Sequence, residues 1–102
     1  LGGHLVSGHV DGTGTVVRFD AIGDNRLLAV RIDPELCRYV ARKGSVTVNG
    51  VSLTVNEIEG DVFSVYLIPH TLAATNLGRL AAGARVNVEV DLMARYIERM
   101  LA

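Results

Sequence analysis

The sequence predicts an all-β domain, built as a closed antiparallel barrel of five or six strands with short helices and a final helix. Two observations support this prediction. Short apolar segments with alternating side chains recur along the chain, and the segments between them are short and rich in Gly, Asn and Asp. Closing the sheet would remove its exposed edges. With 102 residues, the chain suffices for one domain with its own core, so we expect a single domain over 1–102.

The first pair of strands is predicted at residues 15–19 and 27–32. The second segment is mostly aliphatic, and the turn-forming sequence Gly23-Asp24-Asn25 precedes it. These segments therefore predict a hairpin.

A short helix is expected next. Asp33 can cap it, and Pro34 suits the first helical position. Leu36, Tyr39 and Val40 follow at a helical spacing, which predicts a single apolar face.

The clearest turn in the chain is Asn49-Gly50, because both residues tolerate positive φ. It predicts a type I′ hairpin between residues 45–48 and 51–55. The second arm alternates between a core face and a polar face, with Val51, Leu53 and Val55 on one side and Ser52, Thr54 and Asn56 on the other.

Two further strands and a helix complete the chain. Residues 62–68 are predicted as a strand, and residues 85–90 alternate valines with Arg85, Asn87 and Glu89, so we expect those three side chains to face solvent. Asp91 can then cap a helix over about 91–101. The apolar stripe of that helix comprises Leu92, Met93, Tyr96, Ile97, Met100 and Leu101.

Composition narrows the function classes. The net charge of −1 gives no electrostatic basis for binding nucleic acid or a membrane surface. No apolar run approaches the roughly 20 residues that cross a bilayer. We therefore expect a soluble, cytoplasmic protein whose natural partners are small neutral molecules.

Three familiar chemistries are disfavoured. The glycines at 8, 12 and 14 precede a strand rather than a helix, so they do not form a phosphate loop. His4 and His9 lie five residues apart, on opposite faces of an extended segment, so no metal site is expected. Cys37 lies on a short helical segment near Leu36 and Val40 and is interpreted as a small core residue rather than a nucleophile, because a free cysteine is usually buried.

Polar groups at strand ends and turns are the remaining candidates for a site. Hydroxyls can donate and accept hydrogen bonds, and loop amides supply fixed donors, which together match the edge of a uracil-like ring. Each hydroxyl taken singly could equally bond to nearby backbone. Lys43 could likewise be a solvated lysine near a helix end. Residues 71–77 are expected to form a helical turn whose amides point to the same pocket. The hydroxyl candidates are Ser7, Ser52, Thr54 and Thr71.

Three motifs in this order resemble one known family. They are the N-terminal segment LGGHLVSGHVDGTG, the hairpin arm NGVSLTVN and the turn LIPHT, and the closing VEVDLMARYIER agrees as well. Together they resemble riboflavin synthase, and within it the second of its two lumazine-binding repeats. The resemblance spans essentially the whole chain.

The resemblance implies a six-stranded barrel and a trimer assembled through the C-terminal helix. Each active site of the family forms between the N-terminal barrel of one subunit and the C-terminal barrel of another. The implied reaction is a dismutation, in which two molecules of 6,7-dimethyl-8-ribityllumazine exchange a four-carbon unit. The products are riboflavin and 5-amino-6-ribitylamino-pyrimidinedione. No cofactor and no metal are implied, because the substrate itself acts as nucleophile and electrophile.

The family's functional residues carry over to matching positions of this sequence. His9 is expected to exchange a proton, since histidine titrates near neutral pH; a histidine bonding only turn backbone is the alternative. Ser52, His4 and Asp91 match further positions that the family associates with activity. The implied ligand contacts are Ser7, Gly8, His9, Lys43, Ser52, Leu53, Thr54, Ile68, Pro69, His70, Thr71 and Leu72.

The sequence departs from the family in lacking the N-terminal repeat, so it resembles the C-terminal half alone. We expect such a chain to bind its ligand weakly and to turn over slowly or not at all. Two copies could also pair and imitate the shared site.

Two other function classes are compatible with a small barrel. A non-catalytic antenna-type module would hold a lumazine or a flavin in the same way. An oligonucleotide-binding barrel is disfavoured, because five aromatic residues and the lack of net positive charge do not suit base stacking over a basic groove.

Overall fold

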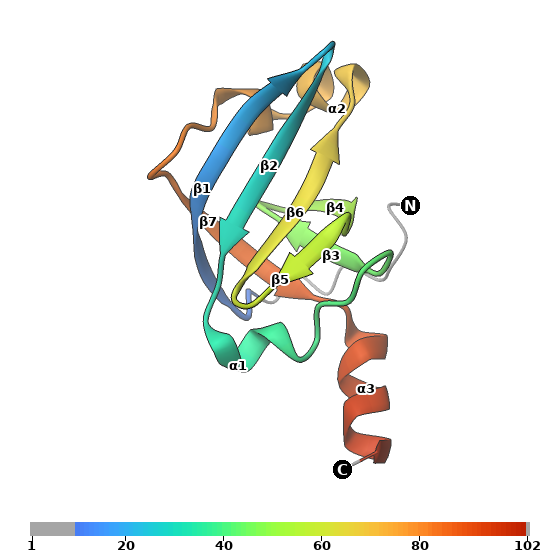
Figure 1. The fold of residues 1–102 in the computed structure, drawn as a ribbon. Coiled ribbons are helices and arrows are strands. Elements are labelled where there is room, and N and C mark those ends of the chain that lie inside the picture. The colour runs from blue at the N-terminus through green and yellow to red at the C-terminus, as the bar shows by residue number, and fades with distance from the viewer. Residues whose placement is uncertain (1–9, 102) are drawn as a thin grey trace.

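The computed structural model describes residues 10–101 and shows a single antiparallel sheet with short helices (Figure 1). The mostly antiparallel β architecture expected from the sequence is confirmed. The strands are β1 Gly12–Ile22, β2 Asn25–Arg31, β3 Ser45–Val48, β4 Val51–Thr54, β5 Glu57–Glu59, β6 Val62–Leu67 and β7 Arg85–Val90.

Four helical segments interrupt or follow the sheet. In Figure 1, α1 and α2 lie at opposite ends of the sheet, and α3 projects away from it. The segments are α1 Pro34–Cys37, α2 Pro69–Ala74, the 3-10 helix η1 Asn76–Arg79, and α3 Leu92–Leu101. In the described part of the chain, no helix is both long and apolar enough to cross a membrane.

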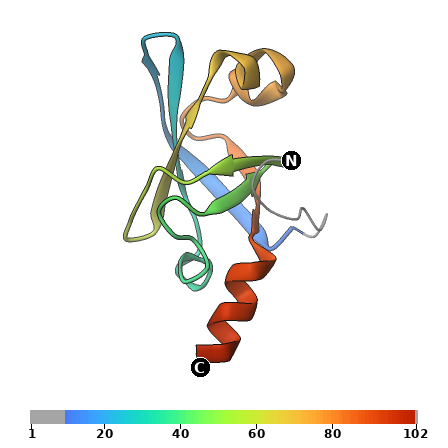
Figure 2. The same ribbon diagram turned by 90° about the vertical axis from the view of Figure 1, so that its right-hand side faces the viewer.

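The sheet differs from the expected closed barrel of six strands. Its order is β4-β3-β7-β1-β2-β6-β5, so seven strands form a curled half-barrel with β4 and β5 at its edges (Figure 2). The additional strand is β5, which pairs with β6 through a turn at Gly60, where φ is 58°. Its sequence Glu57–Glu59 lacks the apolar pattern by which a strand is recognised.

Both hairpins expected from the turn residues are confirmed. β1 pairs with β2 from Thr15↔Arg31 to Ile22↔Asn25, with an irregularity between Val16 and Arg18. β3 pairs with β4 around Asn49 and Gly50, whose φ values are 47° and 82°. Positive φ at both central residues is the signature of the type I′ turn.

The core lies on the concave side of the curled sheet and is almost wholly aliphatic. Alternate residues of β1, β2, β3, β6 and β7 point into it, which follows from the two-residue period of strands. Two residues outside the strands, Val55 just after β4 and Leu77 of η1, are also fully buried. The hydrophobic strand residues with at most 2% exposure are Val16, Leu28, Val30, Val46, Val48, Phe63, Val65, Leu67, Val86, Val88 and Val90.

Gly14 of β1 is placed where no side chain fits. A Cβ built there would lie 2.5 Å from Val30 Cγ1 and 2.9 Å from the Arg31 carbonyl oxygen. We predict that Gly14→Ala lowers the free energy of unfolding by about 1–3 kcal/mol through overpacking. Urea denaturation followed by circular dichroism measures this loss.

Gly12→Ala is the matched control, because the nearest atom to its added Cβ is Leu36 Cδ1 at 3.0 Å, the end of a flexible side chain. We expect this variant to lose less stability than Gly14→Ala. Equal losses would show that strand entropy rather than the close approach at Gly14 governs both sites.

One expectation about β7 is wrong. Arg85 and Asn87 are exposed as predicted, but Glu89, which should have faced solvent with them, is only 6% exposed. Glu89 pairs with Thr47 of β3, which is 1% exposed. A buried polar pair on the outer side of a strand cannot be read from alternation alone.

Both helix caps expected from the sequence are observed, whereas the first helix is shorter than expected. Asp33 Oδ1 accepts a hydrogen bond from the Glu35 N–H at 2.9 Å, but α1 ends at Cys37, so Tyr39 and Val40 lie beyond it. Asp91 Oδ1 accepts from the Met93 N–H at 2.9 Å and starts α3. The large exposed side chains of α3 are Met93, Tyr96, Ile97, Met100 and Leu101.

Candidate functional site

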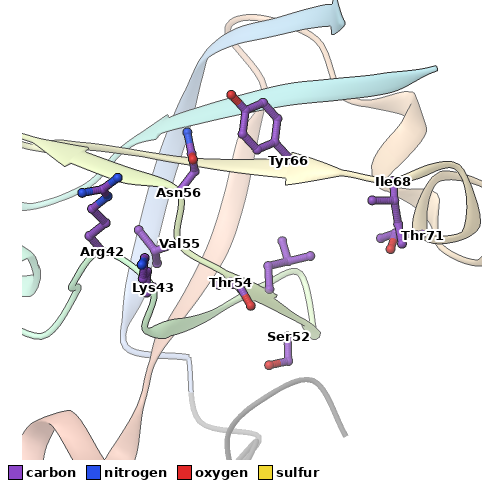
Figure 3. A pocket seen from close by; sticks show the side chains of 10 residues that line it. Arg42, Lys43, Ser52, Thr54, Val55, Asn56, Tyr66, Ile68 and Thr71 are labelled. Carbon is purple, nitrogen blue, oxygen red and sulfur yellow. The ribbon is translucent and has the colours of Figure 1, made fainter. Parts of the chain in front are cut away.

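A cavity of about 440 Å³ opens between edge strand β4, strand β6 and the start of α2 (Figure 3). The cavity lies where the curled sheet brings β4 towards β6 without joining the two by a strand pairing among the described residues. It is lined by Arg42, Lys43, Ser52, Leu53, Thr54, Val55, Asn56, Tyr66, Ile68 and Thr71.

Strand β4 supplies the hydroxyl side of the cavity. Ser52 and Thr54 project from the same side of the strand (Figure 3), as its two-residue period requires. Ser52 is half-buried and Thr54 is exposed, whereas Leu53 is buried. An edge strand can therefore present two hydroxyls to a ligand while its other face contributes to the core.

Lys43 is held beside these hydroxyls by an unusual backbone conformation. Its φ is 68°, in the left-handed region that few residues other than Gly adopt. The Lys43 N–H donates to the Val55 carbonyl oxygen at 2.8 Å, and the Val55 N–H donates to the Gly44 carbonyl oxygen at 2.8 Å. These bonds join the loop to the end of β4, so the position of Lys43 depends on the sheet.

The two cations at this end of the cavity differ in their partners. Arg42 Nε lies 3.1 Å from Glu57 Oε1 of β5. Within residues 10–101, the Lys43 ammonium forms no ion pair. Lys43 is therefore the cation available to an electron-rich ligand atom.

Asn56 and Tyr66 form the β6 side of the cavity (Figure 3). The Asn56 N–H donates to the Ser64 carbonyl oxygen at 2.7 Å, and its side-chain amide donates to Ser64 Oγ at 3.5 Å. Tyr66 is 48% exposed. A large, open aromatic surface on this side suits contact with a flat ring.

The first turn of α2 closes the remaining side through Ile68 and Thr71. The helix starts at Pro69, and no side chain caps its N-terminus. The Thr71 carbonyl oxygen is occupied, because it accepts from the Thr75 hydroxyl at 2.7 Å and from the Thr75 N–H at 3.1 Å. Thr71 thus faces the cavity from a locally braced turn.

The structure brings part of the expected ligand set together. Pro69 and His70 are exposed outside the lining, Leu72 packs against the core, and Asp91 caps α3 outside the lining. His4, Ser7, Gly8 and His9 lie outside the described residues. The expected residues that line the cavity are Lys43, Ser52, Leu53, Thr54, Ile68 and Thr71.

Sequence reasoning missed four lining residues: Arg42, Val55, Asn56 and Tyr66. Asn56 had been placed on the polar face of its strand, which was a usable signal. Tyr66 could not have been found in this way, because its presence at the cavity depends on how β6 curls towards β4.

Cys37 does not belong to this cavity. Its side chain is half-buried against the core, and its Sγ lies 3.7 Å from the Asp33 carbonyl oxygen. Burial, aided by the carboxylates of Asp61 and Asp33, raises the pKa of the Cys37 thiol. A raised pKa lowers the thiolate fraction, which disfavours nucleophilic chemistry at this residue.

A second hollow of about 440 Å³ lies beside α1, between β1, β7 and the end of β2. Arg31, Arg85, Asp11, Asp33 and Glu35 all contribute to it, so both signs of charge meet there. The cavity between β4 and β6 is the better candidate, because it combines an apolar surface with a few convergent polar groups, as small-molecule sites do. Among the described residues, no three His, Cys, Asp or Glu side chains are grouped to hold a metal ion.

The curled antiparallel sheet and its hydroxyl-lined cavity define a β-domain suited to a small, flat ligand. Residues 7–91 match the model of the lumazine binding domain. The chain therefore belongs to the lumazine-binding domain family.

Several relatives that match almost the whole of this chain are riboflavin synthases. The chain is 48% identical over 101 residues to the riboflavin synthase of Photobacterium leiognathi, covering 99% of this chain and 46% of the relative. It is 45% identical to that of Mycobacterium tuberculosis, covering 99% and 52% respectively. The chain thus spans about half the length of the curated relatives it matches.

Solved structures agree with this fold. The crystal structure of LumP complexed with 6,7-dimethyl-8-(1'-D-ribityl) lumazine has a TM-score of 0.82 and 28% identity, covering 88% of this chain and 51% of that one. The structure of LumP complexed with riboflavin has a TM-score of 0.82 and 29% identity, covering 88% and 49%.

Proposed function

We propose that this chain is a lumazine-binding domain of riboflavin synthase and binds 6,7-dimethyl-8-ribityllumazine in the cavity between β4 and β6. The observation that carries this proposal is the convergence of Ser52, Thr54, Lys43 and Thr71 on one cavity. These residues come from three separated segments of the sequence. The family membership of the chain supports the same ligand class.

The cavity has the size and chemistry that this ligand requires. Its volume of about 440 Å³ falls within the roughly 300–1,000 Å³ of small-molecule sites. Leu53, Val55 and Ile68 offer apolar contact, and Tyr66 offers an aromatic surface. The hydroxyls and Lys43 match the carbonyl and N–H groups at the polar edge of a pteridine ring.

The proposed activity is the contribution of half of an active site. In the dismutation, a four-carbon unit passes from one lumazine to another, giving riboflavin and 5-amino-6-ribitylamino-pyrimidinedione. No external cofactor is needed, because the substrate provides both reacting partners. The protein's part is then to hold two rings face to face and to favour loss of a proton from a ring methyl group. His9, Ser52, His4 and Asp91 remain the proposed catalytic residues.

The proposed partner is the N-terminal barrel of another riboflavin synthase subunit. A helix with an exposed apolar stripe after the last strand supports assignment to the C-terminal repeat and assembly as a trimer through α3. The assignment of residues 1–102 to one domain and a cytoplasmic location remain predictions.

Titration with 6,7-dimethyl-8-ribityllumazine tests the proposal directly. We expect saturable quenching of the ligand's fluorescence by the chain alone, with little formation of riboflavin until an N-terminal repeat is added. The absorbance of riboflavin reports the chemistry separately. Absence of binding would contradict the proposed function, and rapid turnover by the isolated chain would contradict the proposed half-site.

A non-catalytic antenna-type module is the second candidate. It is supported by the fold shared with LumP in complex with lumazine, riboflavin and flavin mononucleotide. This candidate predicts tight ligand retention without product, even when the N-terminal repeat is supplied. The same titration therefore separates the two.

A further inference from the structure

The cavity between β4 and β6 carries positive charge without a carboxylate among the described residues that line it. These residues include Arg42 and Lys43 but no Asp or Glu. The hollow beside α1 differs, because three carboxylates share it with two arginines. A third hollow of about 260 Å³, on β1, β2, β5 and β6, contains Arg18 together with Glu57 and Glu59. Since the whole chain has a net charge of −1, the positive charge of the cavity is a local property.

The two cations lie together at one end of the cavity. Figure 3 shows Arg42 and Lys43 on the opposite side from Ile68 and Thr71. The Lys43 N–H donates to the Val55 carbonyl oxygen at 2.8 Å, which attaches this segment to the residue that follows β4. A negative charge at this end of a bound ligand would therefore face both cations.

Glu57 neutralises only one of the two cations. Arg42 Nε lies 3.1 Å from Glu57 Oε1, in a pair whose side chains are 64% and 52% exposed. Such exposed pairs contribute little to stability, so a ligand can compete for the guanidinium, which has five N–H donors. Within the described residues, the Lys43 ammonium has no carboxylate partner. Two cations against one carboxylate leave an excess of positive charge at this end of the cavity.

We propose that Arg42 and Lys43 form an anion subsite, so that the cavity prefers a negatively charged ligand to its neutral counterpart. This inference rests on the proposed function, because it concerns ligands of the same class. In that class the negative charge has two sources. One is a phosphate at the end of the ribityl chain, which guanidinium and ammonium groups bind through charge-assisted hydrogen bonds. The other is a ring that has lost a proton and carries the charge on its carbonyl oxygens.

The first arm of the test compares flavin mononucleotide with riboflavin, which lacks the phosphate, by quenching of flavin fluorescence. We expect the chain to prefer flavin mononucleotide by about tenfold or more, in keeping with hydrogen bonds to charged groups. Arg42→Met and Lys43→Met remove one charge each but keep an unbranched side chain, and each should reduce the preference to about threefold or less. The preference is a ratio of two affinities, so a uniform loss of folded protein does not change it.

Glu57→Gln tests the same subsite in the opposite direction. It removes the carboxylate that competes for Arg42, so the preference for flavin mononucleotide should rise above that of the native chain. Arg31→Met is the matched control. Arg31 also pairs with a carboxylate, that of Asp61 at 3.5 Å, but it lies outside the cavity lining, so its removal should leave the preference unchanged.

The second arm follows the absorbance of bound 6,7-dimethyl-8-ribityllumazine as the pH is raised. A nearby cation favours the anion, so the pKa for loss of a proton from the ring methyl group should be lower in the bound ligand than in the free ligand. Lys43→Met should return this pKa towards that of the free ligand. The proton passes to the buffer, so the measurement needs no second substrate and no turnover.

The outcomes distinguish the two sources of charge and separate this inference from the function on which it rests. A preference for flavin mononucleotide places the phosphate at the subsite, and a lowered pKa of the bound lumazine places the ring there. Equal affinities for the two flavins together with an unshifted pKa would overturn the subsite while leaving the proposed function intact. The same conclusion would follow if Arg42→Met and Lys43→Met changed neither measurement. A chain that binds neither flavin nor lumazine would contradict the proposed function itself.

Discussion

Replacing Phe63 by alanine is expected to lower the free energy of unfolding by about 3–5 kcal/mol, the usual cost of removing a buried aromatic side chain. Phe63 is fully buried near the start of β6, where it pairs with Val30 of β2 and Ile58 of β5. Domains of this size have total stabilities of about 5–15 kcal/mol, so the variant should be barely stable at 37 °C. Urea denaturation followed by circular dichroism measures the loss.

Phe19→Ala is the matched control for this prediction. Phe19 lies on β1 and only borders the core, with the Arg26 guanidinium 5.4 Å from its ring centroid. The same atoms are removed, but less apolar surface is lost from the interior, so we expect less than half the effect. Equal losses at the two positions would mean that the deeper burial of Phe63 does not determine the cost of its removal.

The second large effect is expected at Thr54, where a tryptophan should weaken lumazine binding by at least about 30-fold, equivalent to roughly 2 kcal/mol. Thr54 is exposed on an edge strand and lines the cavity between β4 and β6. An indole can be built there without entering the core, and it would occupy volume that the ligand needs. Titration with 6,7-dimethyl-8-ribityllumazine measures the change.

Asn87→Trp provides the comparison for Thr54→Trp. Asn87 is exposed on β7 and is not part of the cavity lining, so the same bulky side chain should leave ligand affinity unchanged. Thermal midpoints should be similar for both variants. Retention of full affinity by Thr54→Trp would place the ligand elsewhere on the molecule.

Local sequence signals predicted the elements whose cause is local. The hairpin at Asn49-Gly50 forms because both residues adopt positive φ, and the caps at Asp33 and Asp91 form because a carboxylate reaches a free N–H two residues ahead. The motifs resembling riboflavin synthase led to a family that the comparison with known domains confirms.

Three other features could not be predicted from local sequence signals. Strand β5 carries two glutamates and is a strand only because β6 offers it an unpaired edge. Glu89 alternates as a solvent-facing residue should, yet it is buried opposite Thr47 of β3. Tyr66 reaches the cavity only because the sheet curls.

By itself, the sequence determined the mostly β class, the turns, the caps and the identity of the hydroxyl residues at β4, since these depend on the conformational preferences of a few adjacent residues. The tertiary structure alone decided the sheet order, the curl that creates the cavity, and the burial of Glu89 opposite Thr47. Those features depend on contacts between segments that lie far apart in the sequence, such as Gly12 and Val88. Side-chain periodicity within one segment carries no information about which strand will become its neighbour.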